Sequence, residues 1–217
     1  MKKILLVRHV QRPAAIAATE VAMRELAQLG ITVVSEDQLK SEVTGAEAPE
    51  LVLAMGGDGT ILAAAESARR YDIPLLGINA GHMGFLAEAS PESIPKLMHR
   101  LATGDFEVEK RSTLDVSIKL PGDNTIEDWA LNDAVVKHTD PAHPVHLILV
   151  VDGQDVSTYG ADGMILSTPT GSTAYSFSAG GPVVWPDTEA VVISPIAAHG
   201  LFTRPLVVGP SSTIEVF

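Results

Sequence analysis

The sequence contains no cysteine, few aromatic residues, and more acidic than basic side chains. Without cysteine, the 217-residue chain can form neither a disulfide nor a thiolate metal site, and it suits a reducing compartment. Asp and Glu number 27 against 15 Lys and Arg, which gives a formal net charge of -12. A surface this acidic argues against nucleic acid and anionic membranes as partners. A polyanionic ligand would therefore need local binding groups, such as backbone amides, a few basic side chains or a divalent cation.

Long apolar segments are also missing. No run approaches the ~20 residues that span a bilayer, and the apolar run between Lys3 and Arg8 is too short for a signal peptide. Hydrophobic residues still make up 46% of the chain, so we expect a packed core rather than disorder. The length allows one large domain or two small ones.

Strand and helix patterns alternate over residues 1–104, which predicts an α/β domain with a doubly wound, mostly parallel sheet. The expected strands are 3–7, 31–34, 51–55 and 74–78, and the expected helices are 13–29, 61–71 and 90–103. The first helix should present an apolar face made of Ile16, Met23, Leu26 and Leu29. Gly30 and Gly104 are expected to end the first and third helices.

Residues 105–217 change to a pattern of short strands, which predicts a mostly-β domain. The expected strands are 106–120, 129–136, 146–151, 164–167, 191–193, 205–208 and 213–217. The dipeptide Asp152-Gly153 directly after one of these strands predicts a tight hairpin.

The most informative stretch is the apolar strand 51–55 followed by the Gly-Gly-Asp-Gly-Thr turn at 56–60. A strand, a glycine turn and a helix aim backbone amides at an anion, and glycine lets a phosphate approach closely. A carboxylate beside a phosphate repels it unless it holds a metal or takes a proton. Asp58 therefore points to phosphoryl transfer. The alternative is a structural turn in which Asp58 caps the helix.

Two further stretches carry polar groups suited to a nucleotide. Residues 162–181 are rich in serine, threonine and glycine, and such hydroxyls suit ribose and phosphate oxygens. The alternative is a polar connection that caps a short helix at Thr173. Asn132 and Asp133 interrupt an apolar strand, so this amide and carboxylate need partners from the protein or from an adenine or ribose. Both alternatives stay open.

Several enzyme signatures are absent from the sequence. The histidines do not fall at a metal-ligand spacing, and neither a P-loop nor a Gly-x-Ser-x-Gly elbow is present. The chain is thus neither a P-loop enzyme nor a hydrolase of the elbow type.

Taken together, these stretches resemble the NAD kinase family, within the superfamily of diacylglycerol kinase-like enzymes. The resemblance rests, in order and spacing, on 56–60, 79–85, 131–133, 162–181 and 204–207. It implies transfer of a phosphoryl group from ATP or polyphosphate to the 2′-hydroxyl of the adenosine ribose of NAD, giving NADP. It also implies Mg²⁺ or another divalent cation, a cytoplasmic location, and a homodimer or homotetramer.

The resemblance also implies roles for individual residues. Asp58 would be the catalytic base, and Gly56, Gly57, Gly59 and Thr60 would bind phosphate. The implied substrate-binding residues are Gly59, Phe85, Asn132, Asp133, His143, Asp162, Thr170, Thr173, Ala174, Tyr175 and Ser178. No side chain is assigned as a metal ligand.

The chain departs from the family pattern in two places. The family usually has Asn-Glu where this chain has Asn132-Asp133, so the carboxylate loses about one methylene of reach. Family members usually continue past the strand at 213–217, so we expect this chain to be truncated there. Two other functions remain as alternatives. One is a lipid kinase of the diacylglycerol or sphingosine type that shares the glycine turn, and the other is a non-catalytic nucleotide-binding module.

Overall fold

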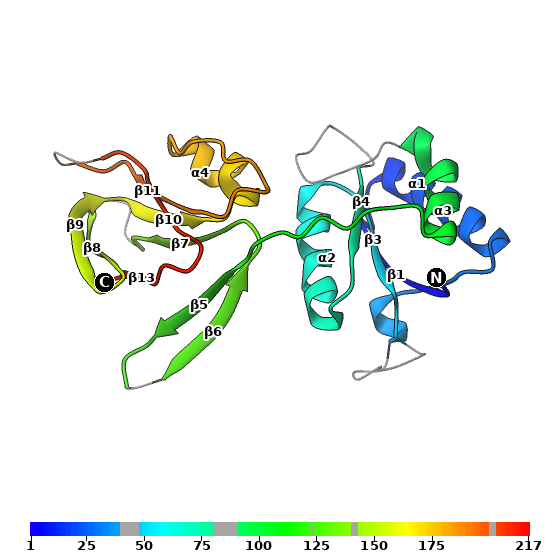
Figure 1. Ribbon diagram of the computed structural model, residues 1–217, viewed down its shortest axis with the longest axis horizontal. Helices are drawn as coiled ribbons and strands as arrows, with labels where there is room; N and C mark the ends of the chain where they lie inside the picture. The colour runs from blue at the N-terminus through cyan, green and yellow to red at the C-terminus, as the bar shows by residue number, and fades with distance from the viewer. Residues whose placement is uncertain (40–47, 80–90, 123, 140–142, 200–202) are drawn as a thin grey trace. The chain divides into compact units, whose positions relative to one another are not determined.

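The computed structural model describes residues 1–39, 48–79, 91–122, 124–139, 143–199 and 203–217. The chain forms two compact units, Met1–Glu109 and Lys110–Phe217. The first unit is α/β with a parallel sheet and the second is mostly β, so the predicted fold class is confirmed (Figure 1). Among the helices that the structure describes, none is long and apolar enough to cross a membrane.

The N-terminal unit is built on a four-stranded parallel sheet. Its strands are β1 (Lys3–Arg8), β2 (Thr32–Val34), β3 (Leu51–Met55) and β4 (Leu75–Ile78), in the order β2-β1-β3-β4. Every pair is parallel, and β1 meets β3 with Arg8 opposite Met55. Their carboxyl ends therefore share one edge of the sheet, where ligands bind in open α/β folds.

Three helices cover the two faces of this sheet. They are α1 (Pro13–Gln28), α2 (Asp58–Tyr71) and α3 (Ile94–Thr103), with the short helices η1 (Glu36–Gln38) and η3 (Pro91–Ser93) between them. One buried cluster joins α1 and α3 to one sheet face, and a second joins α2 to the other (Figure 1). All five residues of β3 are buried, because a central parallel strand has both faces covered. The doubly wound prediction is thus confirmed.

Helix α1 buries a different set of side chains from the one expected. Its buried residues are Ala15, Ala18, Thr19, Ala22 and Leu26. Met23 is 45% exposed and Leu29 is 38% exposed, so these two assignments were wrong. The alanines and Leu26 let α1 pack directly against the sheet and α3, whereas Met23 and Leu29 fall beyond the contact stripe.

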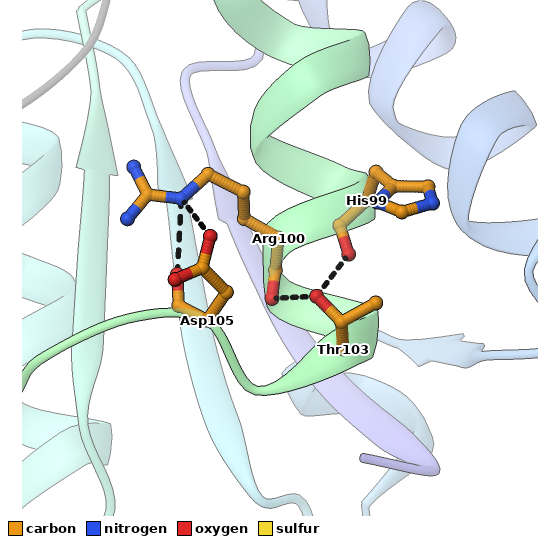
Figure 2. A network of polar contacts seen from close by, with 4 residues as sticks. All are labelled: His99, Arg100, Thr103 and Asp105. Carbon is orange, nitrogen blue, oxygen red and sulfur yellow. Dashed lines mark hydrogen bonds and ion pairs between the residues drawn. The ribbon is translucent and has the colours of Figure 1, made fainter.

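The end of α3 at Gly104 is as predicted. Gly104 has φ +73°, and the N–H of Asp105 donates to the carbonyl of Arg100 over 2.9 Å. The Arg100 Nε donates to the Asp105 carboxylate over 2.9 Å, which closes the turn (Figure 2). The Thr103 hydroxyl donates to the carbonyls of His99 and Arg100, both over 3.1 Å. These contacts satisfy carbonyls that a helix end otherwise leaves unpaired.

The described residues of the C-terminal unit form three antiparallel sheets. The largest has the order β12-β11-β10-β7, the second has the order β13-β8-β9, and β5 pairs with β6. The strands are β5 (Leu114–Lys119), β6 (Thr125–Ala130), β7 (Asp133–Lys137), β8 (Val145–Val151), β9 (Gln154–Ala161), β10 (Gly163–Ser167), β11 (Val191–Ile196), β12 (Leu206–Val208) and β13 (Ile214–Val216). One buried cluster joins the first two sheets through Leu149, Tyr159, Met164 and Ile193.

Two strand predictions in this unit need correction. The expected strand 106–120 begins only at Leu114, and residues 105–113 have no regular structure. The expected strand 129–136 is two strands, β6 and β7, separated by Leu131 and Asn132. The hydroxyl and the backbone N–H of Thr168 donate to this break, and sequence periodicity does not report such long-range bonds. The predicted hairpin is confirmed, with φ +51° at Asp152 and +75° at Gly153 between β8 and β9.

Candidate functional site

The glycine turn follows directly from β3 and opens α2. Gly57 is the N-cap residue of α2, and Asp58 is the first helical residue. The interpretation of Asp58 as the cap is therefore wrong. The N–H of Gly56 donates to the Ile78 carbonyl over 3.0 Å, which ties the turn to β4. The N–H groups of Thr60 and Ile61 both donate to the Gly57 carbonyl, over 2.8 and 3.1 Å. The amides at the very start of a helix generally lack partners within it, and together with the helix dipole they attract an anion.

The three glycines of the turn have different surroundings. A methyl group on Gly56 would overlap the Thr60 side chain, so Gly56 is needed for packing inside the turn. A methyl group on Gly59 would have no atom of the described residues within 4 Å. On Gly57, the one described atom within 4 Å of it would be Nη1 of Arg12, at 3.5 Å. Gly57 and Gly59 therefore leave open space over the backbone, where a phosphate could approach.

In the C-terminal unit, the break between β6 and β7 is held by the end of β10. The Thr168 hydroxyl donates to the Leu131 carbonyl over 2.6 Å, and the Thr168 N–H donates to the Asn132 carbonyl over 2.9 Å. Ser167 lies opposite Asp133 in the antiparallel pair of β10 and β7. These bonds fix the backbone of the Asn132-Asp133 pair.

The turn after β10 rests directly on this pair. A methyl group on Gly171 would overlap the backbone carbonyl of Asn132, so only glycine fits there. The Gly171 N–H donates to the Thr168 hydroxyl over 3.1 Å. One threonine side chain thus connects the 131–132 break with the start of η4 (Thr170–Thr173).

The side chains of the pair present a buried amide oxygen and a half-buried carboxyl. Oδ1 of Asn132 is buried and finds no hydrogen-bond donor among the described residues. Burial raises the pKa of Asp133 from its ordinary value of 3.8, and a hydrogen bond from the Tyr175 backbone N–H opposes this rise. A buried acceptor without a donor is destabilising, so a bound hydroxyl or amino group would relieve it.

Most of the remaining sequence-predicted residues lie in η4 and α4 (Tyr175–Ser178), which follow one another after β10. Thr170 is 7% exposed, and Tyr175 is 41% exposed. Ala174 is the N-cap of α4, and no side-chain capping bond forms there, so the alternative of a helix capped at Thr173 is wrong. Ser178 is exposed at the end of α4. The structure thus brings together Asn132, Asp133 and the 170–178 segment.

Asp162 lies apart from this group. It immediately precedes β10, whereas Asn132 and Asp133 meet the other end of that strand, at Ser167. At ~3.3 Å per residue, Asp162 and Ser167 are about 17 Å apart along the chain. The neighbour of Asp162 is His138, whose Nε2 lies 3.8 Å from Oδ1 of Asp162. The His138 N–H also donates to the Asp162 carbonyl over 3.1 Å.

The roles expected of Phe85 and His143 remain predictions. Phe85 lies outside the described residues. His143 is exposed just before β8. No group of three or more His, Asp or Glu residues that could hold a metal occurs within the described part of the chain.

Two residues near the site were missed by sequence reasoning. Thr168 was taken as one hydroxyl among many, because its bonds to Leu131 and Asn132 span more than thirty positions. Arg12 approaches Gly57 from a segment that carries no motif. Neither contact has a local sequence signal, since both arise only when distant strands pair.

The comparisons with known proteins agree with this arrangement. Residues 45–106 match the family described as ATP-NAD kinase N-terminal domain, and residues 131–217 match the ATP-NAD kinase C-terminal domain. The chain is 43% identical over 230 residues to NAD kinase 2 of Streptomyces coelicolor, covering 100% of this chain and 76% of that protein. It is 43% identical to the NAD kinase of Leifsonia xyli, covering 98% and 75%.

Two solved structures share the fold. The yeast NADH kinase complexed with NADH superposes with a TM-score of 0.88 at 26% identity, covering 100% of this chain and 72% of that one. The NAD kinase from Archaeoglobus fulgidus in complex with ATP gives a TM-score of 0.79 at 34% identity, covering 99% and 80%. The two domain matches and the identity across nearly the whole length place this chain in the NAD kinase family.

Proposed function

We propose that this chain transfers the terminal phosphoryl group of ATP or polyphosphate to the 2′-hydroxyl of the adenosine ribose of NAD, giving NADP. The observation that carries the proposal is the Asn132-Asp133 pair. Its backbone is held by Thr168, one buried oxygen lacks a donor, and one carboxyl is half-buried. A buried amide oxygen and a half-buried carboxyl suit the hydroxyl and amino donors of an adenosine. Family membership and the NADH and ATP complexes of related proteins support the same assignment.

The N-terminal unit supplies the phosphate site and the base. Amides at the start of α2 and the open space over Gly57 and Gly59 hold the phosphate charge. Asp58 takes the proton from the ribose hydroxyl as that oxygen attacks the phosphorus, and the donor's remaining phosphate leaves. Positioning and charge stabilisation dominate such a reaction, so the fixed turn matters as much as the base.

The C-terminal unit supplies the adenosine contacts. Oδ1 of Asn132 accepts a hydrogen bond from the adenosine, and Asp133 accepts one from a ribose hydroxyl. Thr170 and Thr173, in η4, line the adenosine, and so does Tyr175 at the start of α4. Asp133 accepts the backbone N–H of Tyr175, so its carboxyl is aimed before the substrate arrives.

Asp162 serves the nicotinamide half of NAD, and we propose that it acts across subunits. It lies about 17 Å along β10 from the adenosine contacts of its own chain. A homodimer or homotetramer in which Asp162 of a second copy completes the site would place both halves of NAD. The oligomeric state and the cross-subunit contact are tested together by mixing Asp58→Asn and Asp162→Asn chains, because shared sites would restore activity in the mixture.

A divalent cation fits this site as part of the donor. The described residues contain no cage of three carboxylates or histidines, and the glycine turn offers the single carboxylate Asp58. Mg²⁺ commonly binds through one or two carboxylates and the substrate's own phosphate oxygens. When bound, Mg²⁺ would neutralise phosphate charge. A chain without cysteine is compatible with the reducing cytoplasm, which also contains ATP and NAD, so we propose that the protein acts there.

The direct test is formation of NADP by the chain with NAD and Mg²⁺, run in parallel with ATP and with polyphosphate. Diacylglycerol and sphingosine are offered as competing acceptors, since the lipid kinases share the glycine turn. NADP formation with no lipid phosphate is the expected result. NAD binding without any NADP, with either donor, would support a non-catalytic nucleotide-binding module instead.

A further inference from the structure

The glycine turn carries a negative charge at Asp58, yet it is proposed to hold a polyanionic donor. The structure brings one cation to this turn. The guanidinium of Arg12 lies so close to Gly57 that a methyl group there would be 3.5 Å from Nη1. Arg12 lies between β1 and α1, outside every motif of the sequence.

The backbone that carries Arg12 is tied to the strand that carries the glycine turn. β1 and β3 are neighbours, and Arg8 is opposite Met55. The next residue, His9, donates its N–H to the Met55 carbonyl over 3.0 Å. Met55 immediately precedes the turn at 56–60, so the segment after β1 and the turn after β3 have a common anchor.

Local bonds then fix the position of Arg12 itself. Nδ1 of His9 accepts the N–H groups of Gln11 and Arg12, both over 3.2 Å. Arg12 is the N-cap residue of α1, and its carbonyl accepts the N–H of Ile16 over 3.0 Å. Pro13 restricts the backbone directly after it. The long side chain therefore starts from a fixed point beside the turn.

The charge of Arg12 is not neutralised by the described part of the chain. No ion pair between Arg12 and a described carboxylate is present, and the first turn of α1 contains no acidic residue. The side chain is exposed, so it is accessible to a ligand. In a protein with a net charge of -12, an arginine beside the glycine turn with no ion pair to any described carboxylate is a local positive charge available to an anion.

We propose that Arg12 binds a phosphate group of the phosphoryl donor, across the space that Gly57 leaves open. The inference rests on the proposed phosphate role of the 56–60 turn. A guanidinium presents a planar fork of N–H donors that matches two phosphate oxygens, and it stays charged at every working pH. The ligand class is the phosphate chain of ATP or of polyphosphate, and the competing source of phosphate is the pyrophosphate of NAD.

The test is a comparison of Arg12→Gln, Arg12→Lys and Arg24→Gln with the unchanged chain. Arg24 is an exposed arginine on the same helix, so Arg24→Gln is the matched control. KM and kcat are measured with ATP varied at saturating NAD, with NAD varied at saturating ATP, and with polyphosphate as donor. Calorimetric titration with Mg-ATP gives a readout that does not depend on NADP formation.

A charge-assisted contact predicts that Arg12→Gln raises KM for ATP and weakens Mg-ATP binding by about 10- to 100-fold. KM for NAD should stay within about twofold. Arg12→Lys should have an intermediate effect on KM for ATP and on Mg-ATP binding, because lysine keeps the positive charge but lacks the planar set of N–H donors. Unchanged Mg-ATP binding in Arg12→Gln would overturn the proposal, as would a rise in KM for NAD alone. If NADP never forms but Mg-ATP binding still weakens, the kinase assignment fails while the Arg12 contact stands.

Discussion

The carboxyl of Asp133 accepts a hydrogen bond from the backbone N–H of Tyr175, which joins the start of β7 to the start of α4. These two residues lie more than forty positions apart in the sequence. The bond holds the acidic member of the Asn132-Asp133 pair against the hydroxyl-rich segment. The Asn132-Asp133 pair and the 162–181 stretch are therefore in direct contact.

This relationship predicts a pH-dependent effect of Asp133→Asn on stability. Burial raises the pKa of Asp133 above 3.8, so the folded chain binds this proton more tightly than the unfolded chain. That stabilisation is complete at low pH and is lost as pH rises through the raised pKa. Asparagine cannot ionise, so Asp133→Asn should raise Tm at pH 7 by up to about 2 °C, and the difference should shrink toward pH 4.

Thermal melts at pH 4, 5, 6 and 7 check this expectation, with Asp155→Asn on β9 as the matched control. Asp155 is exposed, so its substitution should leave Tm unchanged within about 1 °C. A Tm difference between Asp133→Asn and the unchanged chain that is constant across the pH range would contradict the role of burial.

Asn132→Leu should separate stability from substrate binding. Oδ1 of Asn132 is buried without a donor among the described residues, so an apolar side chain of similar size should leave Tm equal or slightly higher. If this oxygen accepts a hydrogen bond from the adenosine, KM for NAD should rise about 10-fold or more while KM for ATP stays constant. Steady-state kinetics and a thermal melt measure both. An unchanged KM for NAD would exclude the contact.

Gly171→Ala should disturb the adenosine site through its backbone. The added methyl group would overlap the carbonyl of Asn132, so either the 170–173 turn or the 131–132 break must move. Overpacking of this kind destabilises by about 1–3 kcal/mol. We expect a lower Tm and weaker NAD binding. Gly209→Ala is the control, because the one described atom within 4 Å of its methyl group would be the Ser212 hydroxyl, at 3.9 Å. Equal behaviour of the two variants would be inconsistent with the observed packing.

Gly59→Ala should have opposite effects on stability and activity. A methyl group at this exposed position in the first turn of α2 would meet no described atom within 4 Å, and alanine favours a helix by up to about 1 kcal/mol over glycine. Tm should therefore rise. If a phosphate approaches the backbone at Gly59, KM for ATP should increase severalfold. Full activity with a higher Tm would show that no ligand comes close to this residue.

Much of the fold could be predicted because its signals are local. The apolar run at 51–55, the glycine at 104 and the Asp152-Gly153 dipeptide each act within a few residues. The break between β6 and β7 could not be predicted, because Thr168 creates it from more than thirty residues away. The buried face of α1 was misjudged since periodicity does not tell alanine from the larger apolar side chains.

The candidate site was also predictable only in part. The glycine turn and the 162–181 stretch are recognisable from their residues, and the structure shows how Gly171 and Thr168 bring the second stretch onto Asn132. The separation of Asp162 from Asn132 and Asp133 could not be foreseen. It depends on which end of β10 pairs with the start of β7, and the sequence does not give this register. The approach of Arg12 to Gly57 likewise depends on the pairing of β1 with β3.

The most direct measurement is NADP formation by Asp58→Asn, with Asp72→Asn at the other end of α2 as the control. Asp72 is an exposed C-cap residue with φ +51°, a conformation that asparagine also adopts readily. Loss of a general base predicts a fall in kcat of about 10²- to 10⁴-fold for Asp58→Asn with NAD binding retained, and full activity for Asp72→Asn. Near-normal NADP formation by Asp58→Asn would contradict its role as the base.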